Sequence, residues 1–497
     1  MMRIRIVGTG VMGRGIAQWA ATAGHVVELA DARPESVGEA VGFVRSMIER
    51  AAEKGRITTE EAAAILSRLV PLDRPDEPGD GVDLVVEAVR EDLDTKAELF
   101  RALERVLPAH TIFATNTSSL PVTQVGATLA DPSRLAGMHF FNPAPLMKIV
   151  EVIPGAATRP ELVETLISLV RETGHRAVVV ADTPGFLINH AGRGLINEAL
   201  AVLEEDVASP AVIDRIARDV LGLRMGPFEL MDLTGLDVTS TVIESIWQGF
   251  RYSDRLRASY LTPNRVAAGL HGRKTGRGWF SYQPDAPSPV EQPVKGDTDR
   301  PVWTDDAAVH AALTEAGAVV EPAPSERAVV LVPTWGTTVA SAVAERGLPA
   351  ARTFGVDPLS LATERRVLAV TPAADPAAAR DAAALLARGG KSVSIARDTA
   401  GSVAQRLVAS IVSVAASIAE QGIAAPADID LGVTTGLGYP VGPLAWGEKI
   451  GVDRMLELQR ALHATTGDPR YRPTRWLTER AQLGLPLTAS GTSPADL

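Results

Sequence analysis

The first part of the chain alternates between short apolar runs and longer segments with helical spacing. The apolar runs at residues 4–7, 26–30, 82–87 and 111–115 have the length of buried β-strands. The segments between them carry apolar residues three or four positions apart, which is typical of helices that cover a sheet. Such an alternation predicts a parallel, doubly wound α/β domain, which we place over residues 1–182.

Residues 35–69 interrupt this alternation with a longer helical pattern. The outward positions carry a row of basic and polar residues, namely Arg45, Ser46, Arg50, Lys54 and Arg56. Such a row is usual on a solvated helix face. The alternative is that these side chains, called the basic row below, form a lip for the phosphates of a long substrate.

After residue 182 the pattern becomes helical. A segment rich in Pro, Asp and Glu then leads to a shortened α/β stretch and a second helical stretch. The first strand-helix turn of the shortened stretch, at residues 333–337, lacks the glycines of the first, so we expect no dinucleotide there. The predicted segments are an α/β domain at 1–182, a helical domain at 183–283, a linker at 284–304, a degenerate α/β unit at 305–397, a second helical domain at 398–487 and a frayed tail at 488–497.

The two helical stretches repeat one another without gaps. The sequence DTPG at Asp182 is echoed by DTAG at Asp398, a separation of 216 residues (398 − 182). Further pairs at this separation are Asp214 with Asp430, Gly226 with Gly442 and Asp237 with Asp453. A register held this long predicts a duplicated all-α domain. In the second copy Gln405 occupies the position of Asn189, so an active role need not survive there.

The composition narrows the chemistry. The 497 residues carry a formal net charge of −11, and no Lys/Arg run with interleaved aromatics is present, which argues against nucleic acid as a partner. The absence of cysteine excludes disulfides and a cysteine nucleophile, and the eight histidines show no metal-binding spacing. The N-terminus lacks a signal-peptide pattern, and the most apolar helix, at 407–419, is too short to span a membrane. We therefore expect a cytoplasmic protein without a membrane partner.

A glycine-rich turn directly follows the first predicted strand. Gly8, Gly10 and Gly13 form a GxGxxG pattern that opens a helix, and the next strand ends in Asp31. In a Rossmann-type site these glycines allow a tight turn, approach of the pyrophosphate and close helix packing, while the acid binds the ribose hydroxyl. Asp31 would repel a 2′-phosphate, which favours NAD over NADP, although Arg33 stands close enough to bind such a phosphate.

The stretch MHFFNPAPLMKIVEV at residues 138–152 places a histidine and a carboxylate on two strands, predicted at 136–141 and 148–153. Two prolines between the strands force a turn, so Glu151 can reach His139 from the adjacent strand. A carboxylate on one ring nitrogen fixes the tautomer and leaves the other nitrogen to accept a proton from a substrate hydroxyl. The alternative is a purely structural buried pair.

Polar residues also follow other strands of the predicted sheet. Glu91 lies just beyond the strand at 82–87, and Ser118 and Ser119 follow the strand at 111–115. Because the carboxyl ends of parallel strands face the ligand crevice, we place Glu91 and Ser118 on the nicotinamide side. One of the two serines is also expected to cap the helix that follows.

Together these motifs resemble the L-3-hydroxyacyl-CoA dehydrogenase family. The similarity spans essentially the whole chain and rests on GxGxxG, NTSSL, HFFNP, DTPGF, GPFEL and KTGRGW. It is strongest to the long bacterial form, in which a complete first unit precedes an incomplete second one. The resemblance implies NAD-dependent oxidation of an (S)-3-hydroxyacyl-CoA of the 3-hydroxybutyryl or 3-hydroxyadipyl type to the 3-oxoacyl-CoA, a reaction of fatty-acid β-oxidation.

The resemblance also implies roles for individual residues. It gives His139 as the catalytic base, Glu151 as its orienting partner, and Ser118 and Asn189 as holders of the substrate oxygen. The implied NAD contacts are Gly8, Gly10, Gly13, Asp31, Glu91, Lys96, Ser118, Asn142 and Lys274. The nearest matches to CoA contacts are Ser46 and Lys54, and no metal is implied.

Two other functions fit the same residues. One is an NAD-dependent dehydrogenase of a free 3-hydroxy acid or sugar acid, as in the lambda-crystallin-like branch, and the other is a non-catalytic NAD-binding protein. The basic row separates the first from the main hypothesis, because Arg50 and Lys54 would matter only for a CoA ester. Family members pair through the helical domain. The resemblance therefore implies that the two copies pack on each other around a local twofold within the chain, and it leaves a homodimer open.

Overall fold

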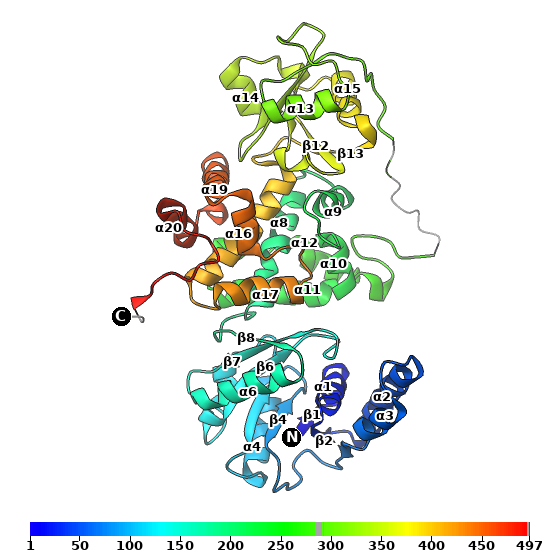
Figure 1. Ribbon diagram of the computed structural model, residues 1–497, viewed down its shortest axis with the longest axis vertical. Helices are drawn as coiled ribbons and strands as arrows, with labels where there is room; N and C mark the ends of the chain where they lie inside the picture. Colours follow the sequence, from blue (N-terminus) through cyan, green and yellow to red (C-terminus); the bar gives the residue numbers. More distant parts are fainter. Residues whose placement is uncertain (285–290, 292, 495–496) are drawn as a thin grey trace. The chain divides into compact units, whose positions relative to one another are not determined.

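The computed structural model describes residues 1–284, 291, 293–494 and 497 (Figure 1). Within these residues the chain forms two compact units, and each takes two separate stretches of the sequence. The first unit is Met1–Asn189 with Gln421–Leu437, and the second is His190–Glu420 with Gly438–Leu497.

The first unit is built on an eight-stranded sheet in the order β3-β2-β1-β4-β5-β6-β7-β8. Its strands are β1 (Arg3–Val7), β2 (Val26–Ala30), β3 (Leu69–Pro71), β4 (Leu84–Glu87), β5 (Ile112–Thr115), β6 (Leu135–Phe140), β7 (Ile149–Pro154) and β8 (Arg176–Val179). All neighbouring strands are parallel except β6 and β7. The strand order reverses at β1, between β2 and β4, which is where a doubly wound sheet opens its ligand crevice. The predicted Rossmann-type α/β class is confirmed for this unit.

Helices fill the connections of this sheet: α1 (Val11–Thr22), α2 (Pro34–Glu53), α3 (Thr59–Leu66), α4 (Leu93–Val106), α5 (Val122–Gly126) and α6 (Pro160–Glu172). The apolar strand residues form the core, and Ile4, Ile6 and Val86 are fully buried. The helical interruption at 35–69 forms α2 and α3, but it ends in the edge strand β3. Three residues that include a proline are too few to show a strand pattern, so the sequence does not predict it.

One helix of the second helical stretch belongs to the first unit. α17 (Pro426–Gly436) contacts β7 and β8. The backbone joins as well, since the amide of Ala181 donates to the carbonyl of Ile423 at 2.8 Å. The first unit is therefore not one contiguous stretch of sequence, as the predicted boundaries had it.

The second unit contains the remaining helices of both stretches. The first stretch forms α8 (Arg193–Glu204), α9 (Pro210–Asp219), α10 (Pro227–Thr234), α11 (Leu236–Gly249) and α12 (Leu261–Ala267), and the second forms α16 (Ser402–Glu420), α18 (Pro443–Ile450), α19 (Val452–Thr466) and α20 (Arg475–Leu483). Helices α8 and α16 cross in close contact, because a Cβ atom on Gly194 would lie 3.0 Å from the carbonyl oxygen of Ser410. Residue 410 is the counterpart of residue 194 in the repeat, so each stretch meets its own copy here.

A second sheet in this unit has five strands in the order β13-β12-β11-β10-β9. The strands are β9 (Val302–Trp303), β10 (Val329–Pro333), β11 (Thr353–Val356), β12 (Arg365–Val370) and β13 (Ser392–Arg397), with α13 (Ala307–Glu315), α14 (Val339–Arg346) and α15 (Pro376–Leu386) between them. Only β11 and β12 run antiparallel, as β6 and β7 do in the first sheet. The five strands therefore correspond to β4–β8.

This correspondence corrects the predicted origin of the second α/β unit. The turn at 333–337 follows β10, the counterpart of β5, so it is not the equivalent of the glycine-rich turn after β1. Within the described residues, the second sheet has no counterparts of β1, β2 and β3. In the part of the chain that the structure describes, the second sheet thus lacks the strands that would hold a dinucleotide.

Two predicted irregular segments are shorter than expected. Of the predicted linker at 284–304, residues 285–290 and 292 lie outside the described residues, but Glu291 accepts a hydrogen bond from Arg365 and β9 pairs with β10. At the start of the predicted tail at 488–497, the amide of Thr488 donates to Glu448 at 2.7 Å, directly after the fully buried Leu487. Single tertiary contacts of this kind leave no periodic signal in a sequence.

Helix α16 is longer than the predicted apolar helix at 407–419. It has 19 residues and is the one helix in the described parts of the chain that passes a length and hydropathy test for a membrane span. However, 89% of its apolar window is buried inside the protein. Such burial is typical of a core helix.

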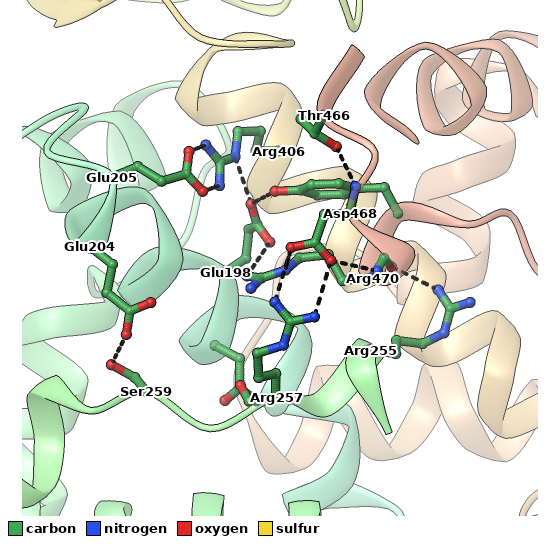
Figure 2. Close-up of polar contacts among 12 residues, drawn as sticks. Glu198, Glu204, Glu205, Arg255, Arg257, Ser259, Arg406, Thr466, Asp468 and Arg470 are labelled. Atoms are coloured by element: carbon green, nitrogen blue, oxygen red, sulfur yellow. Dashed lines mark hydrogen bonds and ion pairs between the residues drawn. The ribbon is translucent and has the colours of Figure 1, made fainter. Parts of the chain in front are cut away.

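A buried ionic network joins the two helical stretches (Figure 2). Glu198 on α8 is buried, and its Oε1 accepts hydrogen bonds from Nε of Arg406 at 2.7 Å and from the hydroxyl of Tyr471 at 2.6 Å. Arg406 on α16 also donates to both oxygens of Glu205, at 2.5 and 2.8 Å. Burial and the Glu198 carboxylate raise the pKa of the Tyr471 phenol well above its ordinary value, so the phenol remains a donor.

Further contacts surround this network. The segment η2 (Asp254–Leu256) faces η7 (Pro469–Tyr471), and Asp468 accepts hydrogen bonds from Arg257 at 3.2 Å and from Arg470 at 3.1 Å (Figure 2). Buried charges of this kind are stable only while each keeps its partners. The network therefore fixes how the two stretches pair.

Replacing Arg406 with methionine is expected to lower the free energy of unfolding by about 3 to 5 kcal/mol, because buried Glu198 loses its closest cation. Denaturant unfolding of the full chain measures the change. As a control, Arg397→Met removes an exposed pair with Asp206 and is expected to cost less than about 1 kcal/mol. Equal losses in the two variants would contradict the role of the buried network.

His190, in α7 (Ile188–Ala191), is buried, and burial together with nearby Arg193 lowers the pKa of its imidazole to about 3. The unfolded chain takes up a proton at this residue below about pH 6.5, whereas the folded protein does not. Stability from this group is thus present above pH 6.5 and is lost as the pH falls. Between pH 7 and pH 5 the loss should be about 2 kcal/mol.

The substitution His190→Leu should remove this part of the acid sensitivity. Denaturant unfolding at pH 7 and pH 5 compares the two proteins. If both lose the same free energy on acidification, the interpretation of His190 as a buried neutral imidazole is wrong.

Candidate active site

The glycine-rich turn between β1 and α1 has the shape of a dinucleotide cradle. Gly8 has a φ of 93°, which favours glycine, and a Cβ atom there would lie 2.5 Å from the carbonyl oxygen of Ala88. A Cβ atom on Gly13 would lie 1.7 Å from the carbonyl oxygen of Gly8, so only glycine lets the helix pack on the turn. Around Gly10, by contrast, nothing lies within 4 Å of the Cβ position. This open space at a helix N-terminus fits a pyrophosphate.

Asp31 is held beside this turn at the end of β2. Its Oδ2 accepts hydrogen bonds from the amide of Thr9 at 2.8 Å and from the Thr9 hydroxyl at 3.1 Å, and its Oδ1 accepts from the amide of Arg33 at 3.0 Å. Arg33 itself is exposed to solvent. The carboxylate is therefore fixed next to the place where an adenosine ribose would lie.

The register of β6 and β7 pairs His139 directly with Glu151. The Nδ1 atom of His139 lies 2.5 Å from Oε2 of Glu151, and the glutamate is fully buried while the histidine is 5% exposed. The ring lies between Phe141, at 4.5 Å between centroids, and Phe186, at 5.7 Å. No hydrogen-bond partner of Nε2 is found within the described residues, so this nitrogen faces outward from the pair.

The chain segment after β8 holds the other oxygen of Glu151. The amides of Leu187 and Ile188 both donate to Oε1 at 2.9 Å. Their orientation comes from a turn in which Gly185 has a φ of 73° and Phe186 a φ of 50°. A bulky residue rarely adopts such a conformation, so the surrounding contacts must hold it. Sequence patterns did not reveal these amides, because main-chain donors have no sequence signature.

Glu91 collects the polar groups that follow β5. Its Oε1 accepts hydrogen bonds from the hydroxyl of Thr117 at 2.7 Å and from the amides of Ser118 and Ser119 at 2.8 and 2.9 Å. Burial opposes the charge on Glu91, but Lys96 and these donors outweigh it and lower its pKa to about 2. Glu91 therefore stays ionised and positions Ser118.

This arrangement corrects the predicted capping role of the two serines. No side chain of the NTSSL segment caps α5. Instead the amides of Val122 and Thr123 donate to the carboxylate of Asp182, at 2.8 and 2.7 Å. A residue sixty positions away performs the capping (182 − 122), which a local motif does not reveal.

Lys96 is buried and contacts two carboxylates of the site. It is 1% exposed and its Nζ lies 2.6 Å from Oε1 of Glu87 and 3.2 Å from Oε2 of Glu91. Glu87, at the end of β4, was not among the predicted residues, and burial raises its pKa. The ammonium group of Lys96 therefore balances the charge of two carboxylates, those of Glu87 and Glu91.

Asn142 lies at the mouth of a cavity of about 280 Å³ between the segment after β6 and the helices α1 and α2. Its lining includes Val11, Arg14, Phe43, Met47, Pro143 and Leu146. The guanidinium of Arg14 stacks over the Phe43 ring at 4.1 Å. A mostly apolar cavity of this size suits an apolar part of a substrate.

The basic row lies on α2 and its C-terminal end, next to residues that line this cavity. Arg45, Arg50 and Lys54 are exposed and Ser46 is half-buried. Within the described residues neither Arg50 nor Lys54 forms an ion pair. Positive charge that is not neutralised by the protein is available to an anionic ligand.

The remaining predicted residues are less closely placed. Asn189 is half-buried and directly follows the two amides that hold Glu151. Lys274 belongs to the second unit, where it forms an ion pair of 2.5 Å with Asp237.

Counterparts of the candidate catalytic residues in the second unit follow from the strand registers. Val356 pairs with Leu368 as Met138 pairs with Val152, so Asp357 stands for His139 and Val367 for Glu151. In the same way Val332 stands for Thr115, which puts Trp335 at the position of Ser118. The second unit therefore has neither a histidine nor a pairing carboxylate at these positions.

In the second unit, neighbouring side chains form hydrogen bonds with the residue at the position of His139. Gln405 donates to Oδ1 of Asp357 at 2.9 Å and to the carbonyl of Thr334 at 2.7 Å, and it accepts from the amide of Gly336 at 3.0 Å. Ser402 donates to the other oxygen of Asp357. Burial raises the pKa of Asp357. Such a saturated cluster leaves no group for acid-base chemistry.

Comparison with known proteins agrees with this geometry. Residues 3–183 match the family described as 3-hydroxyacyl-CoA dehydrogenase, NAD binding domain. Residues 185–282 and 401–495 each match the family described as 3-hydroxyacyl-CoA dehydrogenase, C-terminal domain. Both helical stretches thus resemble one and the same domain.

Individual relatives span different shares of the chain. The chain is 36% identical over 481 residues to 3-hydroxyadipyl-CoA dehydrogenase of Escherichia coli K12, covering 97% of each. It is 39% identical over 281 residues to the probable 3-hydroxybutyryl-CoA dehydrogenase of Bacillus subtilis, covering 56% of this chain and 97% of the relative. The crystal structure of 3-hydroxybutyryl-CoA dehydrogenase from Escherichia coli K12 superimposes with a TM-score of 0.86 at 34% identity, covering 97% of this chain and 98% of that one.

Proposed function

Because the chain belongs to the 3-hydroxyacyl-CoA dehydrogenase family, we propose that it oxidises an (S)-3-hydroxyacyl-CoA to the 3-oxoacyl-CoA with NAD. The observation that carries this proposal is the 2.5 Å contact between Glu151 Oε2 and His139 Nδ1, in the unit that also holds the glycine-rich turn. With Nδ1 occupied, Nε2 is the nitrogen that meets the substrate.

In this reaction His139 acts as the general base. Its neutral ring accepts the proton of the 3-hydroxyl at Nε2, and Glu151 stabilises the resulting imidazolium through Nδ1. Bound NAD supplies the acceptor for the hydride from carbon 3. The burial of Glu151 strengthens its interaction with the imidazolium, because little water screens the pair.

Ser118 and Asn189 are the proposed holders of the substrate oxygen. Glu91 fixes the backbone of Ser118, and Asn189 follows the amides that fix Glu151. Both residues are therefore attached to rigid parts of the site, as stabilisation of a developing charge requires. The NAD contacts proposed are Gly8, Gly10, Gly13 and Asp31 at the turn, with Glu91, Lys96, Asn142 and Lys274 for the nicotinamide half.

The CoA portion is proposed to lie along α2. Asn142 and two residues of α2, Phe43 and Met47, line the cavity of about 280 Å³, and the basic row lies on the same helix and its C-terminal end. Ser46 and Lys54, with Arg50, are the proposed phosphate contacts. The names of the two long relatives suggest a 3-hydroxybutyryl or a 3-hydroxyadipyl group as the acyl chain.

The second helical copy is proposed to replace a partner subunit. The close approach of residue 194 to its counterpart 410 supports a local twofold between α8 and α16. The degenerate α/β unit has no catalytic role in this proposal, because its counterpart of His139 is Asp357.

The substitution His139→Ala should lower kcat by about 10² to 10⁴, because the general base is lost. NADH formation from (S)-3-hydroxybutyryl-CoA measures the effect. The control His310→Ala changes an exposed histidine of α13 and should leave turnover unaltered. Near-normal turnover of His139→Ala would remove His139 from the mechanism.

The double substitution Arg50→Ala and Lys54→Ala should raise KM for a CoA ester by about tenfold, since each lost phosphate contact weakens binding. It should leave KM for a free hydroxy acid unchanged. The matched control Arg101→Ala removes a basic residue of α4, remote in sequence from the basic row.

The substrates to compare are the S and R isomers of 3-hydroxybutyryl-CoA, 3-hydroxyadipyl-CoA and free 3-hydroxybutyrate, each with NAD and with NADP. Turnover of an S-configured CoA ester with NAD is the expected result. Activity on the free acid alone would assign the protein to the sugar-acid branch of the family.

A further inference from the structure

The catalytic pair of the first unit rests on a helix of the second helical copy. Leu187 and Ile188 hold Glu151 through their amides, and their side chains are 0% and 1% exposed. The helix α17 covers these side chains and belongs to the same compact unit. The site is thus completed by residues more than two hundred positions away in the sequence (432 − 187).

Two glycines on one face of α17 receive these side chains. A Cβ atom on Gly432 would lie 2.9 Å from Cδ2 of Leu187, and a Cβ atom on Gly436 would lie 2.7 Å from Cδ1 of Ile188. Residues four apart share a helix face. Glycine destabilises a helix interior, so two glycines at the contact face indicate that close approach is required there.

The other half of the repeat has the reverse distribution of side-chain size. The helix α9 is the counterpart of α17, and it contacts α16, β12 and β13. Its residues at the positions of Gly432 and Gly436 are Ile216 and Val220. Opposite them, at the positions of Leu187 and Ile188, stand Val403 and Ala404.

The backbone connection at both places is the same. Ala181 donates to Ile423 at 2.8 Å, and its counterpart Arg397 donates to Val207 at 2.9 Å. The helices α9 and α17 therefore share the same backbone connection, but the larger side chains lie on α9 in one place and opposite α17 in the other. Only α17 offers the space that Leu187 and Ile188 occupy.

We propose that Gly432 and Gly436 are positioning residues for the His139–Glu151 pair, and that α17 is an integral part of the active site. By seating Leu187 and Ile188, the two glycines set the direction of the amides that hold Glu151, and hence the orientation of the His139 ring. This role gives a reason for the persistence of the second helical copy. The inference rests on the proposed function of His139 as the base.

The test uses the full chain with Gly432→Ala and Gly436→Val. Each added side chain displaces Leu187 or Ile188, and a displacement near 1 Å is expected to lower kcat by about 10- to 100-fold, with KM for NAD changed by less than about twofold. The matched control is Gly38→Ala on α2, an exposed helical glycine with nothing within 4 Å of its Cβ position. Unchanged kcat in both glycine variants would overturn the proposal.

Rescue separates positioning from a general loss of folding. Shortening the opposing side chain, as in Gly432→Ala with Leu187→Ala, or Gly436→Val with Ile188→Ala, restores the space and should recover most of kcat. A glycine variant that folds, with an unaltered circular dichroism spectrum, but is not rescued by its partner substitution would also overturn the proposal.

A readout that needs no substrate distinguishes this inference from the proposed function. The proton between His139 Nδ1 and Glu151 should give a low-field NMR signal that is absent in His139→Gln. The glycine variants should shift or abolish this signal, and the rescued variants should restore it. If the signal behaves in this way but no CoA ester is turned over, the proposed function fails and the positioning role stands. If turnover is normal and the signal does not move, only the positioning role fails.

Discussion

The site depends on one buried carboxylate. Glu151 lies on the antiparallel strand pair β6–β7 without access to water, and a charge in such a place is stable only if donors surround it. Three donors do so: the imidazole of His139 and the amides of Leu187 and Ile188. The strand pair and the turn after β8 are therefore held together, because moving either of them would remove donors from the buried charge.

The same framework recurs in the second copy without its chemistry. The turn with a φ of 50° at Phe186 returns with a φ of 50° at Ser402, and Asp182 and Asp398 each hold the amides of a helix N-terminus. Where the first unit has a histidine to balance its carboxylate, the second has Asp357 alone, satisfied by Ser402 and Gln405. The turn and the capping aspartates therefore recur without the histidine–glutamate pair, because they also serve the packing of the helices.

The parts of the site that depend on local sequence patterns could be predicted from the sequence. The glycine-rich turn, Asp31 and the facing of His139 and Glu151 all follow from strand and turn signals within short stretches. Sequence patterns did not predict the strands β9 and β11 or the capping of α5 by Asp182. Each of these features depends on contacts with residues far away in the sequence. The prediction that the turn at 333–337 is the equivalent of the glycine-rich turn after β1 is wrong. Within the described residues the second sheet has no counterparts of β1, β2 and β3, and their absence leaves no signal in the sequence that remains.

The two helical stretches carry different residues where they meet. The buried pair of Glu198 and Arg406 exists once, because the counterpart of Arg406 is His190 and that of Glu198 is Val414. Two identical second copies would bury Arg406 against valine, and two identical first copies would bury Glu198 against a neutral imidazole. The difference in side-chain size between α9 and α17 also makes the two stretches non-equivalent, because α9 has Ile216 and Val220 where α17 has Gly432 and Gly436. With these differences, each stretch packs better against the other than it would against a second copy of itself.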